Sequence, residues 1–159
     1  MTRRVGAGFT FIELLVTLAI IATLASIVFP MVELNQQRER ERELKSALRE
    51  IRAALSAYKK AGDEGRIVRR VNESGYPRTL QELVDGVEDA KDPTRRKIYF
   101  LRRIPRDPTF PDKAAPAQAT WGKRSYASPP DKPAEGADVF DVYSRTAGTG
   151  LNGIPYREW

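Results

Sequence analysis

The chain contains no cysteine and no histidine. Without cysteine it has no disulfide, no thiolate nucleophile and no zinc-thiolate site, and it gives no redox indication of its compartment. Without histidine it lacks the commonest general base and the commonest transition-metal ligand. Most catalytic templates are therefore excluded, and we expect a protein that is not an enzyme.

Charge is also absent from a long N-terminal segment. No charged residue occurs between Leu14 and Val32, a length that spans roughly 28 Å as a helix at about 1.5 Å per residue. A bilayer core is about 30 Å thick. Arg3 and Arg4 precede the segment, and the positive-inside rule places them in the cytoplasm. We therefore expect one membrane-spanning helix, with the rest of the chain on the far side of the membrane.

Glu13 is the one charge in the run of residues 5–32. A carboxylate at the edge of a membrane span is costly unless another group pairs with it. Charged residues at such positions usually serve a function. Glu13 is therefore the first candidate functional residue, and the identity of its partner is the main question that the sequence raises.

Residues 9–61 contain a single helix breaker, Pro30. From residue 44 the apolar side chains recur at steps of three and four, which places them on one helix face; they are Leu44, Leu48, Ile51, Leu55 and Tyr58, with Ala47 and Ala54 alongside. We predict one helix over residues 9–61, membrane-spanning at about 9–32, kinked at Pro30 and amphipathic at 33–61. The alternating charges of residues 38–43 are interpreted as a solvated helix face.

The remainder, residues 62–159, is predicted to be a small globular head. A capping-box pattern at residues 79–82 indicates the start of a short helix. Apolar and aromatic residues at 125–127 and 139–143 predict two strands, joined by a loop rich in proline, aspartate and glycine. The fold class is therefore α+β, with a long N-terminal helix and a head that contains a short helix and an antiparallel β-sheet.

The segment GFTFIELLV at residues 8–16 resembles the leader motif of type IV prepilins and type II secretion pseudopilins. The resemblance implies that residues 1–8 are a leader peptide and that a prepilin peptidase cuts between Gly8 and Phe9. It also implies N-methylation of Phe9, which leaves Glu13 as the fifth residue of the mature protein. Pro30 falls at the usual helix-proline position of this family, and the implied fold is pilin-like.

The spacing between Phe9 and Glu13 has a physical interpretation. Cleavage after Gly8 gives Phe9 a free amine that is positively charged near neutral pH. A buried carboxylate and a buried ammonium are each costly alone and much less costly together. Glu13 of one subunit can therefore pair with the amine of a neighbour that is shifted along the helix axis, and this pair would fix the register of a filament.

Three further motifs resemble the G-type major pseudopilin of type II secretion. They are YPRTLQEL at residues 76–83, IPRDP at 104–108 and FDVYS at 140–144. The resemblance implies a single-pass inner-membrane protein with a cytoplasmic leader and a periplasmic head. It also implies a homo-oligomeric helical filament in the periplasm that drives protein export together with other pseudopilins and an inner-membrane secretion platform. The alternative is a minor subunit of a type IV pilus that serves adhesion, motility or DNA uptake.

G-type pseudopilins commonly bind calcium in the loop after the last strand. Calcium requires six to eight oxygen ligands, usually with several carboxylates. The corresponding loop here, residues 145–153, contains no carboxylate. We therefore expect no required cofactor and no conventional calcium site, and the weak candidates that remain are Asp138, Asp141 and Asn152.

Other interpretations agree less well with these motifs. A cleaved secretory signal or a plain membrane anchor leaves the spacing of Gly8, Phe9 and Glu13 unexplained. A DNA-uptake pilin would use basic patches at residues 69–70, 95–97 and 102–103, but we interpret these as surface charges and expect no nucleic-acid partner. An enzyme could use paired carboxylates; the pairs are Asp107 with Asp112 and Asp138 with Asp141, and each lies in the ordinary context of turns and strand edges.

Overall fold

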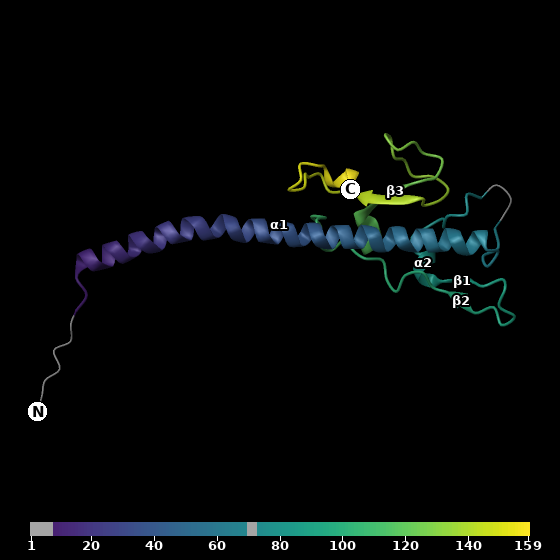
Figure 1. The fold of residues 1–159 in the computed structure, drawn as a ribbon, viewed down its shortest axis with the longest axis horizontal. Coiled ribbons are helices and arrows are strands. Elements are labelled where there is room, and N and C mark those ends of the chain that lie inside the picture. Colours follow the sequence, from purple (N-terminus) through teal and green to yellow (C-terminus); the bar gives the residue numbers. More distant parts are fainter. Residues whose placement is uncertain (1–7, 70–72) are drawn as a thin grey trace, which may run out of the picture. The chain divides into compact units, whose positions relative to one another are not determined.

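The computed structural model describes residues 8–69 and 73–159, without the side chains of residues 27–30. One helix, α1 (Phe11–Asp63), covers the N-terminal third of the chain (Figure 1). The prediction of one uninterrupted helix is confirmed, with both ends about two residues later than expected. The helix ends where Gly65 adopts a positive φ of 71°, and the Arg66 amide donates to the Ala61 carbonyl.

The chain divides into two compact units, residues 1–39 and 40–159. We call the second unit the head, and it includes the C-terminal half of α1. The predicted apolar stripe of α1 lies in its core, with Leu44 and Ile51 fully buried. Other core side chains come from the following segments and include Ile67, Leu80, Leu83, Leu101, Trp121, Val139, Val142 and Tyr156. The amphipathic pattern therefore identified the α1 side of the core correctly.

The predicted capping box at residues 79–82 is wrong, although a short helix does form there. This helix, α2 (Glu82–Asp85), has Gln81 at its N-cap, in a helical conformation and without a side-chain cap. The Glu82 carboxylate instead accepts the Arg78 amide at 3.3 Å and the Tyr58 hydroxyl at 3.4 Å. Burial, followed by the Glu82 charge, raises the pKa of Tyr58 to about 12. Tyr58 therefore stays protonated and links α1 to α2.

The described strands form two antiparallel pairs. The first pair, β1 (Val87–Glu88) with β2 (Lys97–Ile98), was not predicted, because two-residue strands carry no detectable alternation. The second pair joins β3 (Trp121–Arg124) to β4 (Asp141–Ser144). The α+β class is therefore confirmed, while the positions of the strands differ in detail from the prediction.

The strand predicted at residues 125–127 lies earlier in the chain, at β3. The sequence pattern did not indicate a strand at β3 because β3 contains Gly122, and glycine is depleted in strands. Gly122 faces Tyr143 across the β3–β4 pair, and a Cβ at this position would lie 2.3 Å from the Tyr143 ring. The glycine therefore makes room for the aromatic ring, and Ser125 begins a turn, with its carbonyl accepting the Ser128 amide.

Two 3₁₀ turns complete the head. Residues 109–120 are irregular except for η1 (Ala117–Thr120). The C-terminal segment forms a bridge between Thr149 and Pro155 and then the turn η2 (Tyr156–Glu158). Tyr156 and Trp159 pack edge to face, with 5.1 Å between ring centroids.

Candidate functional site

The expected cleavage position lies just before α1. Gly8 and Phe9 are both exposed, and 79% of the Phe9 surface is accessible. A Cβ built on Gly8 meets no atom within 4 Å, so the chain itself does not require glycine there. Residues 1–7, which make up the rest of the expected leader, lie outside the described residues.

Glu13 forms a capping box with Thr10 at the N-terminus of α1. The Thr10 hydroxyl oxygen accepts the Glu13 amide at 3.3 Å, and the Glu13 carboxylate accepts the Thr10 amide at 3.4 Å. The Thr10 hydroxyl also lies 3.5 Å from the same carboxylate oxygen. The negative charge is favourable at a helix N-terminus. The sequence contained the signal, since residues 10–13 carry the same Thr-x-x-Glu pattern that we assigned to residues 79–82.

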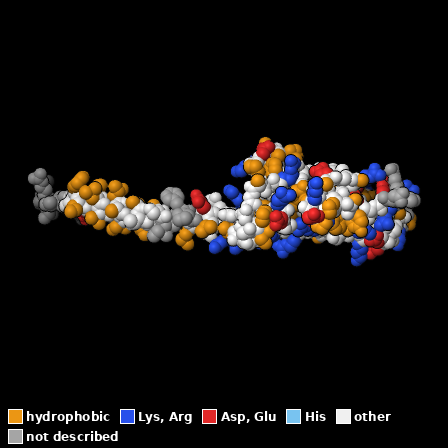
Figure 2. Space-filling model, turned by 90° about the horizontal axis from the view of Figure 1, so that it is seen from above, with side chains coloured by type: hydrophobic (Ala, Val, Ile, Leu, Met, Phe, Trp, Pro, Cys, Tyr) orange, Lys and Arg blue, Asp and Glu red, His pale blue; other side chains and the backbone are white. Residues whose placement is uncertain are grey.

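The first half of α1 exposes its apolar side chains on all sides. Figure 2 shows hydrophobic side chains gathered on this part of the chain, and the exposed fractions include 71% for Ile12 and 62% for Ile21. The most apolar window of α1 has a mean hydropathy of 2.5 and none of it is buried. α1 is therefore a candidate membrane-spanning helix, and this half of it needs lipid or other helices to cover it.

The polar side chains of this half of α1 are bonded within the helix. The hydroxyl of Thr17 donates to the Leu14 carbonyl at 2.9 Å, and the hydroxyl of Ser26 donates to the Ala22 carbonyl at 2.9 Å. Such internal bonds remove the cost of placing a hydroxyl in lipid. The helix assignment continues through position 30, but the side chain of Pro30 lies outside the described ones, so the kink stays a prediction.

Two motifs of the head contact the region of the third motif, at residues 140–144. The Asp107 carboxyl accepts the Ser144 hydroxyl at 2.5 Å, which joins segment 104–108 to segment 140–144. Segment 76–83 meets the same strand region, where the Pro77 carbonyl accepts the Val139 amide at 2.8 Å. Their spacing in the sequence therefore reflects one packed unit around β4.

The carboxylates considered for catalysis have structural partners. Asp107 is fully buried, and its second carboxyl oxygen accepts the amide and the hydroxyl of Thr109 at 2.7 and 2.6 Å. Asp112 is exposed and accepts the Ala114 amide at 2.9 Å. Both residues therefore fix turns, and the described contacts do not bring their side chains together.

The weak calcium candidates also have separate partners. Asp138 accepts the Tyr126 amide at 2.8 Å, Asp141 accepts Arg52 Nε at 2.8 Å, and Asn152 Oδ1 accepts the Ile154 amide at 3.1 Å. No cluster of three or more Asp or Glu residues that could bind a metal occurs among residues 8–69 and 73–159. The donor set therefore does not fit a conventional calcium site.

Two of the three basic patches contain an arginine that pairs with a carboxylate. Arg69 pairs with Asp63 at 2.8 Å and Arg96 with Asp92 at 2.7 Å, while Arg70 lies outside the described residues. Arg102 and Arg103 are exposed. The two pairs lower the local positive potential that a nucleic-acid backbone would require, and the absence of a nucleic-acid partner stays a prediction.

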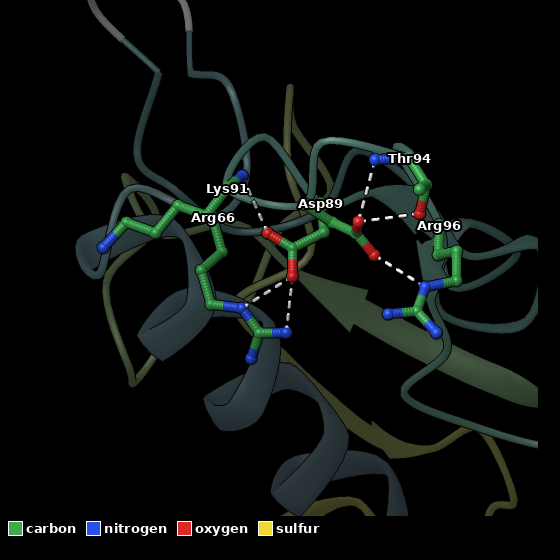
Figure 3. A network of polar contacts seen from close by, with 6 residues as sticks. Arg66, Asp89, Lys91, Thr94 and Arg96 are labelled. Atoms are coloured by element: carbon green, nitrogen blue, oxygen red, sulfur yellow. Dashed lines mark hydrogen bonds and ion pairs between the residues drawn. The ribbon is translucent and has the colours of Figure 1, made fainter.

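A polar network stabilises the segment around β1 and β2 (Figure 3). Two nitrogens of the Arg66 guanidinium donate to one Asp89 oxygen, at 3.0 and 2.6 Å, and the Lys91 amide donates to the other at 3.0 Å. These bonds, Arg66 first, lower the pKa of Asp89. The Arg96 guanidinium, followed by Thr94, holds the pKa of Asp92 far below its usual range.

This network predicts a loss of stability in acid. A carboxyl whose pKa is depressed on folding contributes stability above its unfolded pKa of about 3.9, and the contribution is lost as the pH falls through the folded value. We expect the protection of amides in residues 86–98, measured relative to the intrinsic exchange rate at each pH, to fall only below about pH 4. Asp92→Asn should weaken this pH dependence, whereas Asp131→Asn, at an exposed position, should leave it unchanged. A segment whose protection falls already between about pH 7 and 5 would contradict the assignment.

Comparison with known proteins supports the interpretation of both ends of the chain. Residues 3–29 match the prokaryotic N-terminal methylation motif. A type II secretion system core protein G from Klebsiella pneumoniae is 30% identical over 105 residues, which cover 64% of this chain and 67% of that protein. The protein of the same name from Pseudomonas aeruginosa is 28% identical over 149 residues, 91% of this chain and 85% of the relative.

A third relative is also similar over most of the chain, including the head. The type II secretion system core protein G of Vibrio cholerae is 28% identical over 143 residues, 87% of this chain and 81% of the relative. No solved structure shows significant similarity to the chain. The methylation motif, the apolar helix and the identity to these relatives agree: the chain belongs to the G-type pseudopilins, the family of type II secretion system core protein G.

Proposed function

We propose that this chain is a structural subunit, and not an enzyme, of a periplasmic pseudopilus that drives protein export by a type II secretion system. A prepilin peptidase removes residues 1–8, Phe9 is N-methylated, and the mature chain leaves the inner membrane to join a helical filament. The observation that carries the proposal is the uncovered apolar half of α1, most of which lies within the matched methylation motif of residues 3–29. In a filament this surface packs against the same surface of neighbouring subunits.

The sequence of α1 suits such packing. Ala19, Ala22, Ala25 and Ser26 are small residues at which helix backbones can approach closely. Arg3 and Arg4 before the span favour a cytoplasmic leader and a periplasmic head. Its partners are accordingly the prepilin peptidase during maturation, and further copies of the chain, other pseudopilins and the inner-membrane secretion platform during assembly.

Processing can be tested by mass spectrometry of the protein purified from the membrane and from filaments. We expect the filament form to begin at N-methylated Phe9. Gly8→Val should leave the precursor uncut, because the peptidase has to accommodate residue 8, although the chain leaves open space there. The expected result is accumulation of the precursor in the membrane and loss of essentially all filament.

One control and one further measurement complete this test. Circular dichroism of the Gly8→Val precursor should match that of the wild type, because position 8 is exposed and lies outside α1. Deletion of the chain should also abolish export of the secreted proteins while leaving their synthesis intact. Filaments that retain residues 1–8 would refute the proposed maturation.

A further inference from the structure

We propose that charged side chains on one face of α1 bind the C-terminal loop of the head, residues 145–153, and fix it on α1 without a divalent cation. We call these residues, Glu41, Lys45 and Arg52, the α1 clasp. The inference concerns the head alone and goes beyond the proposed function. It starts from Glu41, which the sequence pattern, together with the rest of residues 38–43, assigned to a solvated face. That assignment is wrong for Glu41, since only 7% of its surface is exposed.

Glu41 binds the C-terminal loop directly. One oxygen of its carboxylate accepts the Leu151 amide at 2.8 Å and the Tyr156 hydroxyl at 3.1 Å. A backbone N–H that points at a carboxylate makes a charge-assisted hydrogen bond, which is roughly twice as strong as a neutral one. Glu41 therefore fixes both the tip of the loop and the beginning of η2 on α1.

Arg52 contacts both ends of residues 141–159, the segment that contains β4, the C-terminal loop and η2. Its Nε donates to Asp141 Oδ1 at 2.8 Å, and its Nη2 donates to the Val142 carbonyl at 3.1 Å and to a main-chain oxygen of Trp159 at 2.7 Å. β4 and the last residue of the chain are thereby joined through one guanidinium. Lys45 adds a contact between these points, with its Nζ 4.5 Å from the centre of the Trp159 ring.

The positions of the clasp residues follow from helix geometry. Glu41 and Arg52 are eleven residues apart, which is about three turns, so both lie on one face of α1 and roughly 16 Å apart along its axis. Figure 1 shows the C-terminal segment, in yellow, alongside this part of α1. The clasp therefore binds residues 141–159 at both ends and in the middle.

The loop presents the wrong groups for a cation. Calcium would be bound by carbonyl and carboxylate oxygens, but Leu151 and Tyr156 present an N–H and an O–H to Glu41. Backbone carbonyls of the loop already accept amides, since Gly148 accepts Tyr156, Gly150 accepts Gly153, and Ile154 accepts Gly150. Gly150 also packs so closely on Trp159 that a Cβ would lie 2.3 Å from the indole ring. The interior of the loop is thus filled by the chain itself.

Hydrogen exchange of the full-length protein in detergent tests this inference. In the wild type, protection of residues 145–159 and the melting temperature should stay the same, within about 1 °C, whether calcium or the chelator EGTA is added. In Glu41→Ala, exchange of the Leu151 amide should be at least about tenfold faster in both conditions, because the bond to a charged acceptor is lost. The exposed neighbour Glu43→Ala should exchange like the wild type.

A conservative variant covers the case in which Glu41→Ala does not fold. Glu41→Gln keeps an oxygen acceptor, so it should retain most of the loop protection and remain insensitive to calcium. The inference is overturned if calcium slows exchange in residues 145–159 of the wild type and EGTA reverses the effect. It is equally overturned if a folded Glu41→Ala protein exchanges at the wild-type rate. Neither result would affect the proposal on filament assembly, which depends on the methylation motif and the apolar half of α1.

Discussion

Replacing Glu13 by alanine should abolish filament assembly while the protein still inserts into the membrane. A charged residue at the centre of a membrane helix costs about 2.5–3.5 kcal/mol on insertion scales, so removing one near the edge cannot make insertion worse. The filament, in contrast, loses the carboxylate that would pair with the amine of Phe9 on a neighbouring subunit. We expect a drop in filament yield to below about a hundredth, since about 3 kcal/mol per buried pair corresponds to more than a hundredfold.

The amide variant separates the proposed charge pair of Glu13 from the capping box that the structure shows. The carboxylate accepts the Thr10 amide within the same chain, and a glutamine side chain can make this bond as well. It cannot pair with a charged amine. If the charge pair drives assembly, Glu13→Gln should be nearly as defective as Glu13→Ala. If the capping box were the essential feature, Glu13→Gln would assemble normally.

The measurement compares membrane-bound and sheared filament fractions for both variants at equal expression. Mass spectrometry has to accompany it, because an uncut precursor would also fail to assemble. The expected result is a cleaved, membrane-inserted protein that is absent from filaments. Normal filaments formed by Glu13→Ala would refute the pairing mechanism.

The extent of the N-terminal helix could be predicted almost completely from the sequence. Its signals are all local: a long apolar run, a single proline, and an apolar stripe at steps of three and four. The structure confirms the single helix α1 (Phe11–Asp63). The capping boxes were less predictable. The Thr-x-x-Glu pattern occurs twice, but only Thr10 and Glu13 form the reciprocal bonds, because the carboxylate of Glu82 is occupied by Tyr58 and Arg78.

The head could be predicted only in outline, because its decisive contacts join distant segments. No local pattern indicates that Glu41, unlike the other charges of residues 38–43, is buried and binds the amide of Leu151, 110 residues further on. The short strand β3 (Trp121–Arg124) was displaced in the prediction because Gly122 matches Tyr143 of the partner strand, a fit that the isolated segment does not reveal. Motif order was informative for a related reason, since the motifs at 104–108 and 140–144 meet in the pair Asp107 and Ser144.

Asp107→Ala should be the most destabilising single substitution proposed for the head, at about 3–5 kcal/mol. The side chain is fully buried, and its carboxyl accepts hydrogen bonds from the Ser144 hydroxyl and from the amide and hydroxyl of Thr109. Removing it leaves the Thr109 amide without this acceptor, at a cost of about 1–3 kcal/mol for the amide alone. The cavity adds to that cost, and the turn at 104–108 loses its bond to β4.

Urea unfolding followed by tryptophan fluorescence measures this effect, because Trp121 lies beside the altered site and donates to the Pro105 carbonyl at 2.7 Å. Asp112→Ala is the matched control, since it removes an exposed carboxylate that accepts only the Ala114 amide among the described contacts, and it should cost less than about 1 kcal/mol. Asp107→Asn should lie between the two, because an amide keeps one acceptor oxygen for Thr109. If Asp107→Ala were as stable as Asp112→Ala, the turn at 104–108 would not depend on its link to β4, and the bond between Asp107 and Ser144 would not explain why the two motifs occur together.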